Sequence, residues 1–163
     1  MSLAVVAIGS NLGDRVANVR AAFVALGELA QAQVLQSRLY GSASWGDASQ
    51  PDYVNAIALF DTRLHAHALL EELLAIERRF GRERSTDVRY AARTLDLDLI
   101  ALGTQRIRDP RLTLPHPHAH ERAFVLLPLA ELAPTFVLPG HGSVESLLKP
   151  EFASLCAPIA SSE

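Results

Sequence analysis

The stretch RTLDLDLIAL (93–102) places two aspartates one residue apart within an otherwise apolar run. Aspartate is depleted in β-strands, and like charges that share one face of a strand repel each other. Residues two apart on a strand point the same way, so Asp96 and Asp98 share a face while the leucines between and beside them face the core. The polar face of such a strand either lies in water or binds a divalent cation. Carboxylate oxygens suit Mg²⁺, which also binds substrate phosphates, and two carboxylates can hold a pair of ions.

Arginines cluster on both sides of the aspartate pair. They are Arg82, Arg84, Arg89 and Arg93 before it and Arg106, Arg108 and Arg111 after it. Guanidinium groups and metal ions neutralise the charge that develops on phosphoryl oxygens, so this pattern indicates polyphosphate chemistry. The segment 81–93 is equally compatible with a solvated, charged loop. Neither GxxxxGK[ST] nor a kinase-type glycine loop is present, which excludes a P-loop.

A second group of residues could recognise a flat, polar ring. Tyr53 and Asn55 lie two apart in YVNAIALFDT (53–62), where an aromatic ring can stack on a heterocycle and a carboxamide can bind its edge. The alternative is a tyrosine and an asparagine on a solvated sheet surface. Trp45 is either a local core residue or part of a ligand lid, and Phe124 would ordinarily be core.

Three histidines occupy alternate positions in LPHPHAHER (114–122), namely His116, His118 and His120. On an extended segment they would share a face, which makes a zinc site conceivable. The segment has no companion cysteine pair and no HExxH motif. A histidine that donates a hydrogen bond to a phosphate is the favoured interpretation.

The elements that must position these residues follow from the hydrophobic periodicity. Strands are expected at 3–8, 34–40, 53–62 and 94–102, helices at 14–30 and 65–81, loops at 41–51 and 81–93, and a further helix near 120–127. Asp14 is the expected N-cap of the first helix, and Gly81 the expected C-terminal stop of the second. The order β-α-β-β-α-β predicts a ferredoxin-like α+β fold, with a largely antiparallel sheet, helices packed on it and a C-terminal extension.

The composition favours one domain spanning residues 1–163, because 163 residues with 49% hydrophobic content can bury one sizeable core. A net charge of −3 gives no global attraction to nucleic acid or anionic membranes. The single cysteine, Cys156, rules out an internal disulfide and fits a reducing compartment. The N-terminus lacks the features of a signal peptide, and no stretch reaches the roughly 20 apolar residues of a membrane span. We therefore expect a cytoplasmic protein without nucleic-acid or membrane partners.

Taken together, these segments resemble the 6-hydroxymethyl-7,8-dihydropterin pyrophosphokinases of folate synthesis. The matching motifs are AIGSNLGD (7–14), QPDYVNA (50–56), IERRFGRER (76–84), RTLDLDLIALG (93–103) and LPHPHAHERAFVLLPLAELAP (114–134). They follow the family's order over residues 3–135. The resemblance implies an ATP- and Mg²⁺-dependent diphosphokinase that transfers pyrophosphate from ATP to the hydroxymethyl group of the reduced pterin and releases AMP.

The resemblance also implies roles for individual residues. Asp96 and Asp98 would bind two Mg²⁺ ions and, with Arg82 and Arg93, form the catalytic group. The residues implied for ATP are Glu77, Arg84, Arg93, Leu99, Arg111, Thr113 and His116. Those implied for the pterin are Ser42, Ala43, Trp45, Tyr53, Asn55, Asp96, Arg122 and Phe124. A monomer that binds small-molecule substrates is the family expectation.

Two other functions use the same residues in part. Another Mg²⁺-dependent enzyme on this fold, such as a phosphohydrolase, would need Asp96 and Asp98 but no pterin pocket. A non-catalytic nucleotide-sensing module on the same fold would be favoured if the arginine-rich loop were only solvated. Because one fold hosts many functions, only the combination of motifs favours the pyrophosphokinase.

Overall fold

A computed structural model of the chain describes residues 1–42, 52–81 and 94–159. Its strands are β1 (Ser2–Ser10), β2 (Leu35–Gln36), β3 (Tyr40–Ser42), β4 (Tyr53–Thr62), β5 (Asp96–Leu102), β6 (Ile107–Arg108), β7 (Thr113–Leu114), β8 (Val137–Leu138), β9 (Gly142–Ser143) and β10 (Cys156–Pro158). Its helices are α1 (Arg15–Leu26), α2 (Ala66–Arg79), α3 (Ala123–Leu132), α4 (Val144–Leu147) and α5 (Phe152–Leu155), with a 3₁₀ turn, η1, at Ala119–Glu121.

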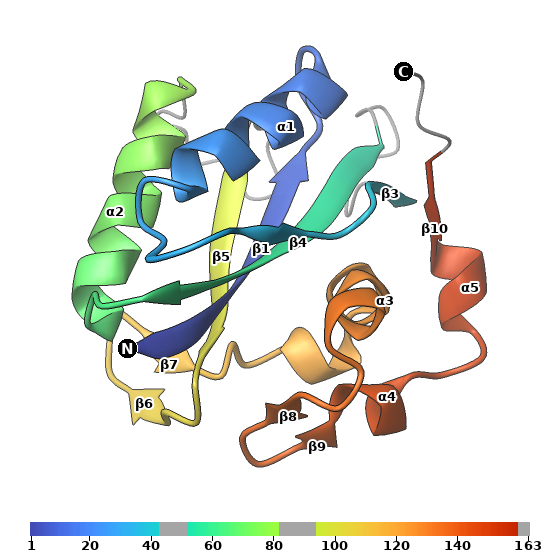
Figure 1. Ribbon diagram of the computed structural model, residues 1–163. Coiled ribbons are helices and arrows are strands. Elements are labelled where there is room, and N and C mark those ends of the chain that lie inside the picture. The colour runs from blue at the N-terminus through green and yellow to red at the C-terminus, as the bar shows by residue number, and fades with distance from the viewer. Residues whose placement is uncertain (43–51, 82–93, 160–163) are drawn as a thin grey trace.

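The main sheet has six antiparallel strands in the order β10-β3-β4-β1-β5, and β2 also pairs with β4 (Figure 1). The order β3-β4-β1-β5 is the one that a β-α-β-β-α-β chain takes in a ferredoxin-like fold. Two short hairpins, β6-β7 and β8-β9, lie outside this sheet. The predicted fold class is confirmed.

Helices cover both faces of the sheet. Helices α1 and α2 bury Val19, Phe23, Leu69 and Leu73 against alternate residues of β1 on one face, while α3 buries Leu126 and other residues on the opposite face (Figure 1). Strand β1 therefore carries apolar side chains on both sides and is buried from Ala4 onward. This arrangement holds the central strands rigidly, so the polar residues near their ends have fixed positions.

The predicted helix boundaries hold at three of the four ends. Asp14 caps α1, since its carboxylate accepts a hydrogen bond from the main-chain N–H of Ala17 at 3.1 Å. Gly81 follows α2 with a φ of +85°, a conformation that favours glycine and ends the helix. The expected helix 14–30 ends early, at Leu26, and the chain continues to residue 30 with bonds between residues three apart, which tighten the last turn.

The expected single strand 34–40 is wrong, because it is divided into β2 and β3. Gln36 pairs with Ala58 and Tyr40 pairs with Asn55, so four steps along this chain oppose three along β4 and one residue is extra. The Ser37 hydroxyl accepts a hydrogen bond from the main-chain N–H of Ile57 at 2.8 Å, so a side chain serves as acceptor in the ladder. Such a β-bulge bends the strand and changes which side chains face the site.

The expected helix near 120–127 is also displaced. It forms α3 at Ala123–Leu132, after the turn η1, and it runs through Pro128. Proline removes one main-chain hydrogen bond from a helix, but Val125, Leu126 and Leu129 are buried on the sheet and compensate for that loss. Tertiary packing therefore overrides the local signal for a helix end.

The C-terminal extension is integrated into the fold. Strand β10 pairs with β3, and the main-chain N–H of Ile159 donates to the carbonyl of Leu39 at 2.8 Å. Phe152 and Cys156 belong to the core on the α3 face. Burial raises the pKa of the Cys156 thiol to about 11, so it stays protonated.

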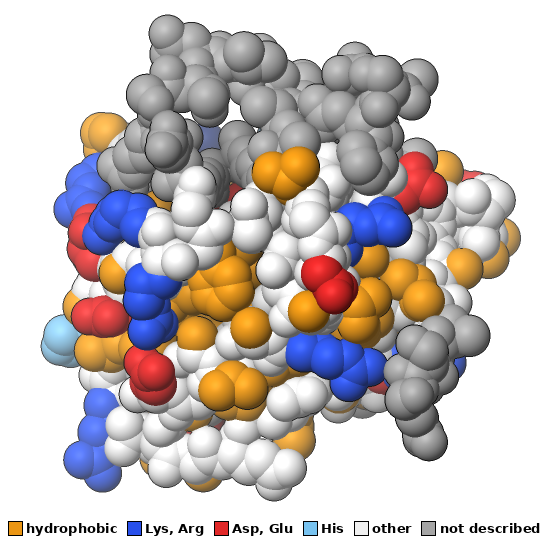
Figure 2. Space-filling model, turned by 90° about the horizontal axis from the view of Figure 1, so that it is seen from above, with side chains coloured by type: hydrophobic (Ala, Val, Ile, Leu, Met, Phe, Trp, Pro, Cys, Tyr) orange, Lys and Arg blue, Asp and Glu red, His pale blue; other side chains and the backbone are white. Residues whose placement is uncertain are grey.

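Charges of both signs are distributed over the face of the molecule that Figure 2 shows. Seen from above, basic and acidic side chains alternate around hydrophobic patches, and the coloured side chains form no continuous basic surface on this face (Figure 2). Within the described ranges, no helix combines the length and hydrophobicity that crossing a membrane requires.

If residues 1–163 form one domain, α5 must contribute to its stability. We expect Phe152→Ala to lower the free energy of unfolding by about 3 kcal/mol, because it empties a buried position. The matched control is Leu155→Ala in the same helix, where the side chain is 58% exposed rather than 3%. That change should cost less than about 0.5 kcal/mol. Urea denaturation measures both, and equal, small effects would show that this segment is not part of the cooperative unit.

Candidate active site

Three strands bring the polar residues into one row across the sheet. Gly9 of β1 pairs with Asn55 of β4 on one side and with Asp96 of β5 on the other. One pair further along, Ala7 lies between Ile57 and Asp98. An antiparallel register thus places a carboxamide and two carboxylates on one face, separated by the two small residues of β1.

The aspartate pair occupies the predicted face of β5. Leu95, Leu97 and Leu99 are 0%, 4% and 4% exposed and pack with α1 and α2, whereas Asp96 and Asp98 are half-buried on the opposite face. The predicted alternation is therefore confirmed. It stops at Leu99, where the pairing with β1 shifts.

That shift is a second β-bulge, and it anchors the histidine segment. Val6 pairs with Leu99 and Val5 with Ala101, so Ile100 is the additional residue. The carbonyl of Ile100 accepts a hydrogen bond from the main-chain N–H of His116 at 2.8 Å. The bulge directly after the aspartates therefore holds His116 beside them.

His116 is neutral at physiological pH. Burial lowers its pKa to about 4, the positive charges of Arg122 and His118 act in the same direction, and Asp96 opposes them. Its Nδ1 accepts a hydrogen bond from the main-chain N–H of His118 at 3.3 Å, which assigns the proton to Nε2. The ring can thus donate a hydrogen bond from Nε2 to an anionic oxygen without carrying a charge.

The residues expected to bind a flat ring line the same cavity as the aspartates. The Asn55 amide donates to the Ser42 hydroxyl at 2.6 Å, which fixes the orientation of the carboxamide. Tyr53 comes from β4 and Phe124 from the first turn of α3, and both are half-buried. The Arg122 guanidinium lies 5.5 Å from the centre of the Phe124 ring, close enough for a cation–π interaction.

Gly9 makes room for these side chains. A Cβ atom at this position would lie 3.3 Å from Oδ1 of Asn55 and 3.4 Å from Cδ1 of Tyr53. The sequence analysis did not identify Gly9, although Ala7 and Gly9 alternate along β1 and so place two small residues on the face that carries the site. Small residues at a two-residue period are a signal that could have revealed this position.

These residues line one cavity of about 630 Å³, a volume within the range of small-molecule sites. Its walls include eight residues that the sequence analysis selected: Ser42, Tyr53, Asn55, Asp96, Asp98, His116, Arg122 and Phe124. Glu121 also lines it and was not expected there. The cavity therefore joins the carboxylate pair to the ring-binding group.

The other residues expected at the nucleotide lie around the outer edge of β5. Glu77 of α2 is buried and accepts a hydrogen bond from the main-chain N–H of Leu97 at 2.7 Å, so this N–H points away from β1. By the alternation of a strand, the N–H of Leu99 faces the same edge, while its side chain belongs to the core. Arg111 forms an ion pair with Glu71 of α2, and Thr113 lies on β7, which contacts β5.

Five predicted site residues lie outside the described part of the chain. They are Ala43, Trp45, Arg82, Arg84 and Arg93. The roles expected for them stay predictions.

Comparison with known proteins identifies the family. Residues 5–134 match the model of the 7,8-dihydro-6-hydroxymethylpterin-pyrophosphokinase family. The chain belongs to this family. A 2-amino-4-hydroxy-6-hydroxymethyldihydropteridine pyrophosphokinase of Haemophilus influenzae is 42% identical over 150 residues, which cover 91% of this chain and 92% of that protein. The protein of the same name from Pseudomonas aeruginosa is 44% identical over 144 residues, with 88% of each chain covered.

Solved structures support the fold of this pyrophosphokinase family member. A Plasmodium falciparum HPPK-DHPS chain, crystallised with pterin and p-hydrobenzoate, superposes with a TM-score of 0.66. The match covers 90% of this chain and 43% of that longer chain, at 11% sequence identity. At that identity the likeness shows the fold alone.

The low pKa of His116 has a consequence for stability. Between pH 6.5 and about 4 the unfolded chain protonates this histidine and the folded chain does not, so stability falls as the pH is lowered through this range. We expect His116→Gln to lose less stability than the parent protein over the same range. Denaturant titrations at several pH values, without divalent cations, measure the difference. Identical pH profiles for the two proteins would contradict the buried, neutral histidine.

Proposed function

We propose that this chain transfers pyrophosphate from ATP to the hydroxymethyl group of 6-hydroxymethyl-7,8-dihydropterin, with AMP as the second product, in folate biosynthesis. Membership of the pyrophosphokinase family supports this activity. The observation that links this activity to particular residues is that Asp96 and Asp98 line the same cavity as Tyr53, Asn55 and Phe124.

The carboxylate pair fits magnesium in particular. Magnesium is commonly held by one or two carboxylates together with substrate phosphates and water. Asp96 and Asp98 supply two carboxylates, and the described residues contain no group of three or more histidine, cysteine, aspartate or glutamate side chains that could hold a metal by themselves. We infer that Asp96 and Asp98 would hold two Mg²⁺ ions, which would neutralise charge on the phosphates of ATP.

The strand order supports separate positions for the two substrates. Proceeding from β4 through β1 to β5, the ring-binding residues come first, the aspartates next and the outer edge of β5 last. We propose that the pterin lies between Tyr53 and Phe124, with Asn55 and Ser42 at its polar edge. ATP then approaches from the outer edge of β5, where Glu77, Leu99, Arg111 and Thr113 are located, and His116 donates from Nε2 to a phosphate oxygen.

The chemistry requires alignment and charge neutralisation more than a strong base. The pterin hydroxyl attacks the β-phosphorus in line with the departing AMP oxygen. Arg122, beside Phe124, is placed near the reacting end of the pterin, where its positive charge stabilises the developing phosphoryl charge. The resemblance assigns Arg82 and Arg93 to closure over the substrates and Arg84 to ATP, with Ala43 and Trp45 at the pterin.

The remaining expectations concern assembly and location. A monomeric state and a cytoplasmic location stay predictions from the sequence. Gel filtration with light scattering tests the first.

The product distribution tests the proposed activity directly. Purified protein is mixed with ATP, Mg²⁺ and 6-hydroxymethyl-7,8-dihydropterin, and the nucleotides are separated by chromatography. AMP that accumulates in step with the pterin pyrophosphate, and only when the pterin is present, supports the proposal. ADP or free phosphate formed without the pterin would indicate a different phosphoryl-transfer enzyme. Nucleotide binding without turnover would favour a sensing module.

Removing either carboxylate should nearly abolish turnover. We expect Asp96→Ala and Asp98→Ala each to lower kcat by at least about a hundredfold, because the charge that positions the metal and the phosphates is lost. Both side chains are half-buried on a polar face, so the folded structure should persist, as circular dichroism can verify. Activity within about threefold of the parent protein would contradict the metal-binding role.

Gly9 offers a test of the pterin side alone. The Cβ added by Gly9→Ala would press on Asn55 and Tyr53, so we expect KM for the pterin to rise by about three- to tenfold while KM for ATP stays unchanged. A control is Gly41→Ala in β3, where the added Cβ lies at an ordinary 3.6 Å from Ile159. Equal changes in both KM values for Gly9→Ala would contradict the proposed division of the cavity.

A further inference from the structure

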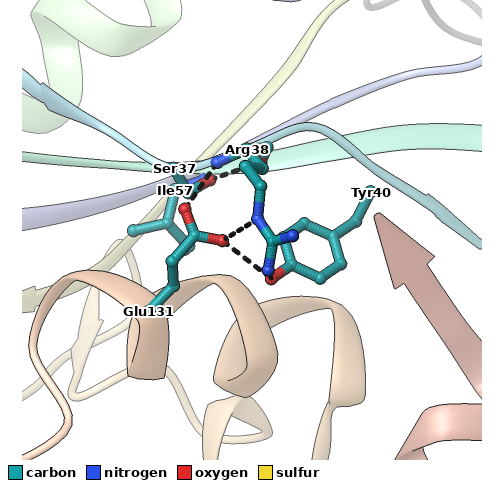
Figure 3. Close-up of polar contacts among 5 residues, drawn as sticks. All are labelled: Ser37, Arg38, Tyr40, Ile57 and Glu131. Carbon is teal, nitrogen blue, oxygen red and sulfur yellow. Dashed lines mark hydrogen bonds and ion pairs between the residues drawn. The ribbon is translucent and has the colours of Figure 1, made fainter. Parts of the chain in front are cut away.

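Glu131 lies outside the cavity described above, yet it connects two of the elements that form its walls. Its carboxylate accepts hydrogen bonds from the main-chain N–H of Arg38 at 2.8 Å, from Nε of Arg38 at 3.0 Å and from the hydroxyl of Tyr40 at 2.8 Å (Figure 3). Arg38 precedes β3, Tyr40 begins it, and Glu131 lies in the last turn of α3. One carboxylate thus joins the sheet to the helix that covers it.

The protonation states of Glu131 and Tyr40 favour a hydrogen bond between them at physiological pH. Burial opposes the ionisation of Glu131, but the hydrogen bonds from Arg38 and Tyr40 outweigh it and lower the pKa of the carboxyl group below its ordinary value. Burial and the hydrogen bond to Glu131 raise the pKa of Tyr40 to about 12. Glu131 therefore remains an acceptor and Tyr40 a donor throughout the physiological pH range.

On the sheet, the residues that Glu131 binds are next to Asn55, the amide proposed to bind the pterin. Tyr40 pairs with Asn55 across β3 and β4, and Ser42, two residues further along β3, accepts the hydrogen bond from the Asn55 amide. The β-bulge at residues 37–39 comes directly before Tyr40, and there the Ser37 hydroxyl accepts from the N–H of Ile57 (Figure 3). Through Arg38 and Tyr40, Glu131 therefore fastens this irregular segment, and the start of β3, to α3.

On the helix, Glu131 shares α3 with Phe124, the phenylalanine that lines the cavity. Phe124 and Glu131 are seven residues apart on α3, which is close to two full turns, so both side chains lie on one face of the helix. Fixing Glu131 on β3 limits both the rotation of α3 and its translation along the sheet. The carboxylate therefore adds to the core packing of α3 in fixing Phe124 relative to Tyr53 of β4.

We propose that Glu131 is a positioning residue for pterin binding, because it holds the strand that bears Ser42 and the helix that bears Phe124 in a fixed relation. The inference rests on the proposed function, since it assigns the pterin to this side of the cavity. Among the described residues proposed for ATP, Glu77 lies on α2, Leu99 on β5 and Thr113 on β7, and Arg111 and His116 lie in the segments on either side of β7. None of the three hydrogen bonds of Glu131 reaches these residues. The effect should therefore fall on one substrate.

Steady-state kinetics of Glu131→Gln test the proposal. The amide retains the size of the side chain but loses its charge and one acceptor oxygen. We expect KM for 6-hydroxymethyl-7,8-dihydropterin to rise by about tenfold, with KM for ATP and kcat within about twofold of the parent values. A purely structural role would lower the amount of folded enzyme, and therefore the apparent kcat, without changing either KM.

Two further variants keep the test decisive. Tyr40→Phe removes only a hydroxyl group from a buried ring and should raise KM for the pterin by about threefold even if Glu131→Gln fails to fold. In the double variant the two effects should be less than additive, because both changes act on the same group of hydrogen bonds around residue 131. Glu145→Gln, an exposed glutamate of α4, is the matched control for the loss of one charge and should leave all constants unchanged.

The outcomes separate this inference from the proposed function. An unchanged KM for the pterin in both variants, or a parallel rise in both KM values, would overturn the positioning role of Glu131. A parent protein that does not use the pterin at all would instead contradict the proposed function.

Discussion

The antiparallel register of β1 with its two neighbours is the constraint on which the site depends. It places Gly9 between Asn55 and Asp96, and Ala7 next to Asp98. A shift of one residue in either pairing would turn the corresponding side chains to the α1 and α2 face, where the core is apolar. The packing of two hydrophobic layers against β1 opposes any such shift. The stability of the core and the geometry of the cavity are therefore two results of one strand arrangement.

Two β-bulges interrupt this regular arrangement among the described strands, one beside the aspartate pair and one directly before β3. The bulge at Ile100 directs a carbonyl to the main chain of His116 and so brings a histidine to the aspartate pair. The bulge at residues 37–39 brings Arg38 and Tyr40 to Glu131. A regular ladder would use these main-chain groups within the sheet, leaving none to connect it to the segments that cover it.

The charges of the site are arranged for an anionic co-substrate that arrives with metal ions. Asp96 and Asp98 are close to Arg122 and to a histidine that stays neutral, because burial and the neighbouring positive charges lower its pKa to about 4. In the proposed function, a neutral donor at this position would bind a phosphate oxygen without competing with the cation for the carboxylates. Glu77 binds the main chain of β5 and so stabilises the strand that carries both aspartates.

The sequence by itself determined the order of the elements, the shared face of Asp96 and Asp98, the cap at Asp14 and the membership of the motifs in one family, because periodicity, capping and motif spacing are local properties of the chain. It also selected the eight residues that meet in the cavity. Only the tertiary structure decided that Gly9 lies beneath Tyr53, that residues 34–40 form two strands, that α3 continues through Pro128 and that the C-terminal segment pairs with β3. Each of these depends on contacts between residues far apart in the chain, such as Ser37 with Ile57 and Glu131 with Tyr40, and no local pattern encodes such a contact.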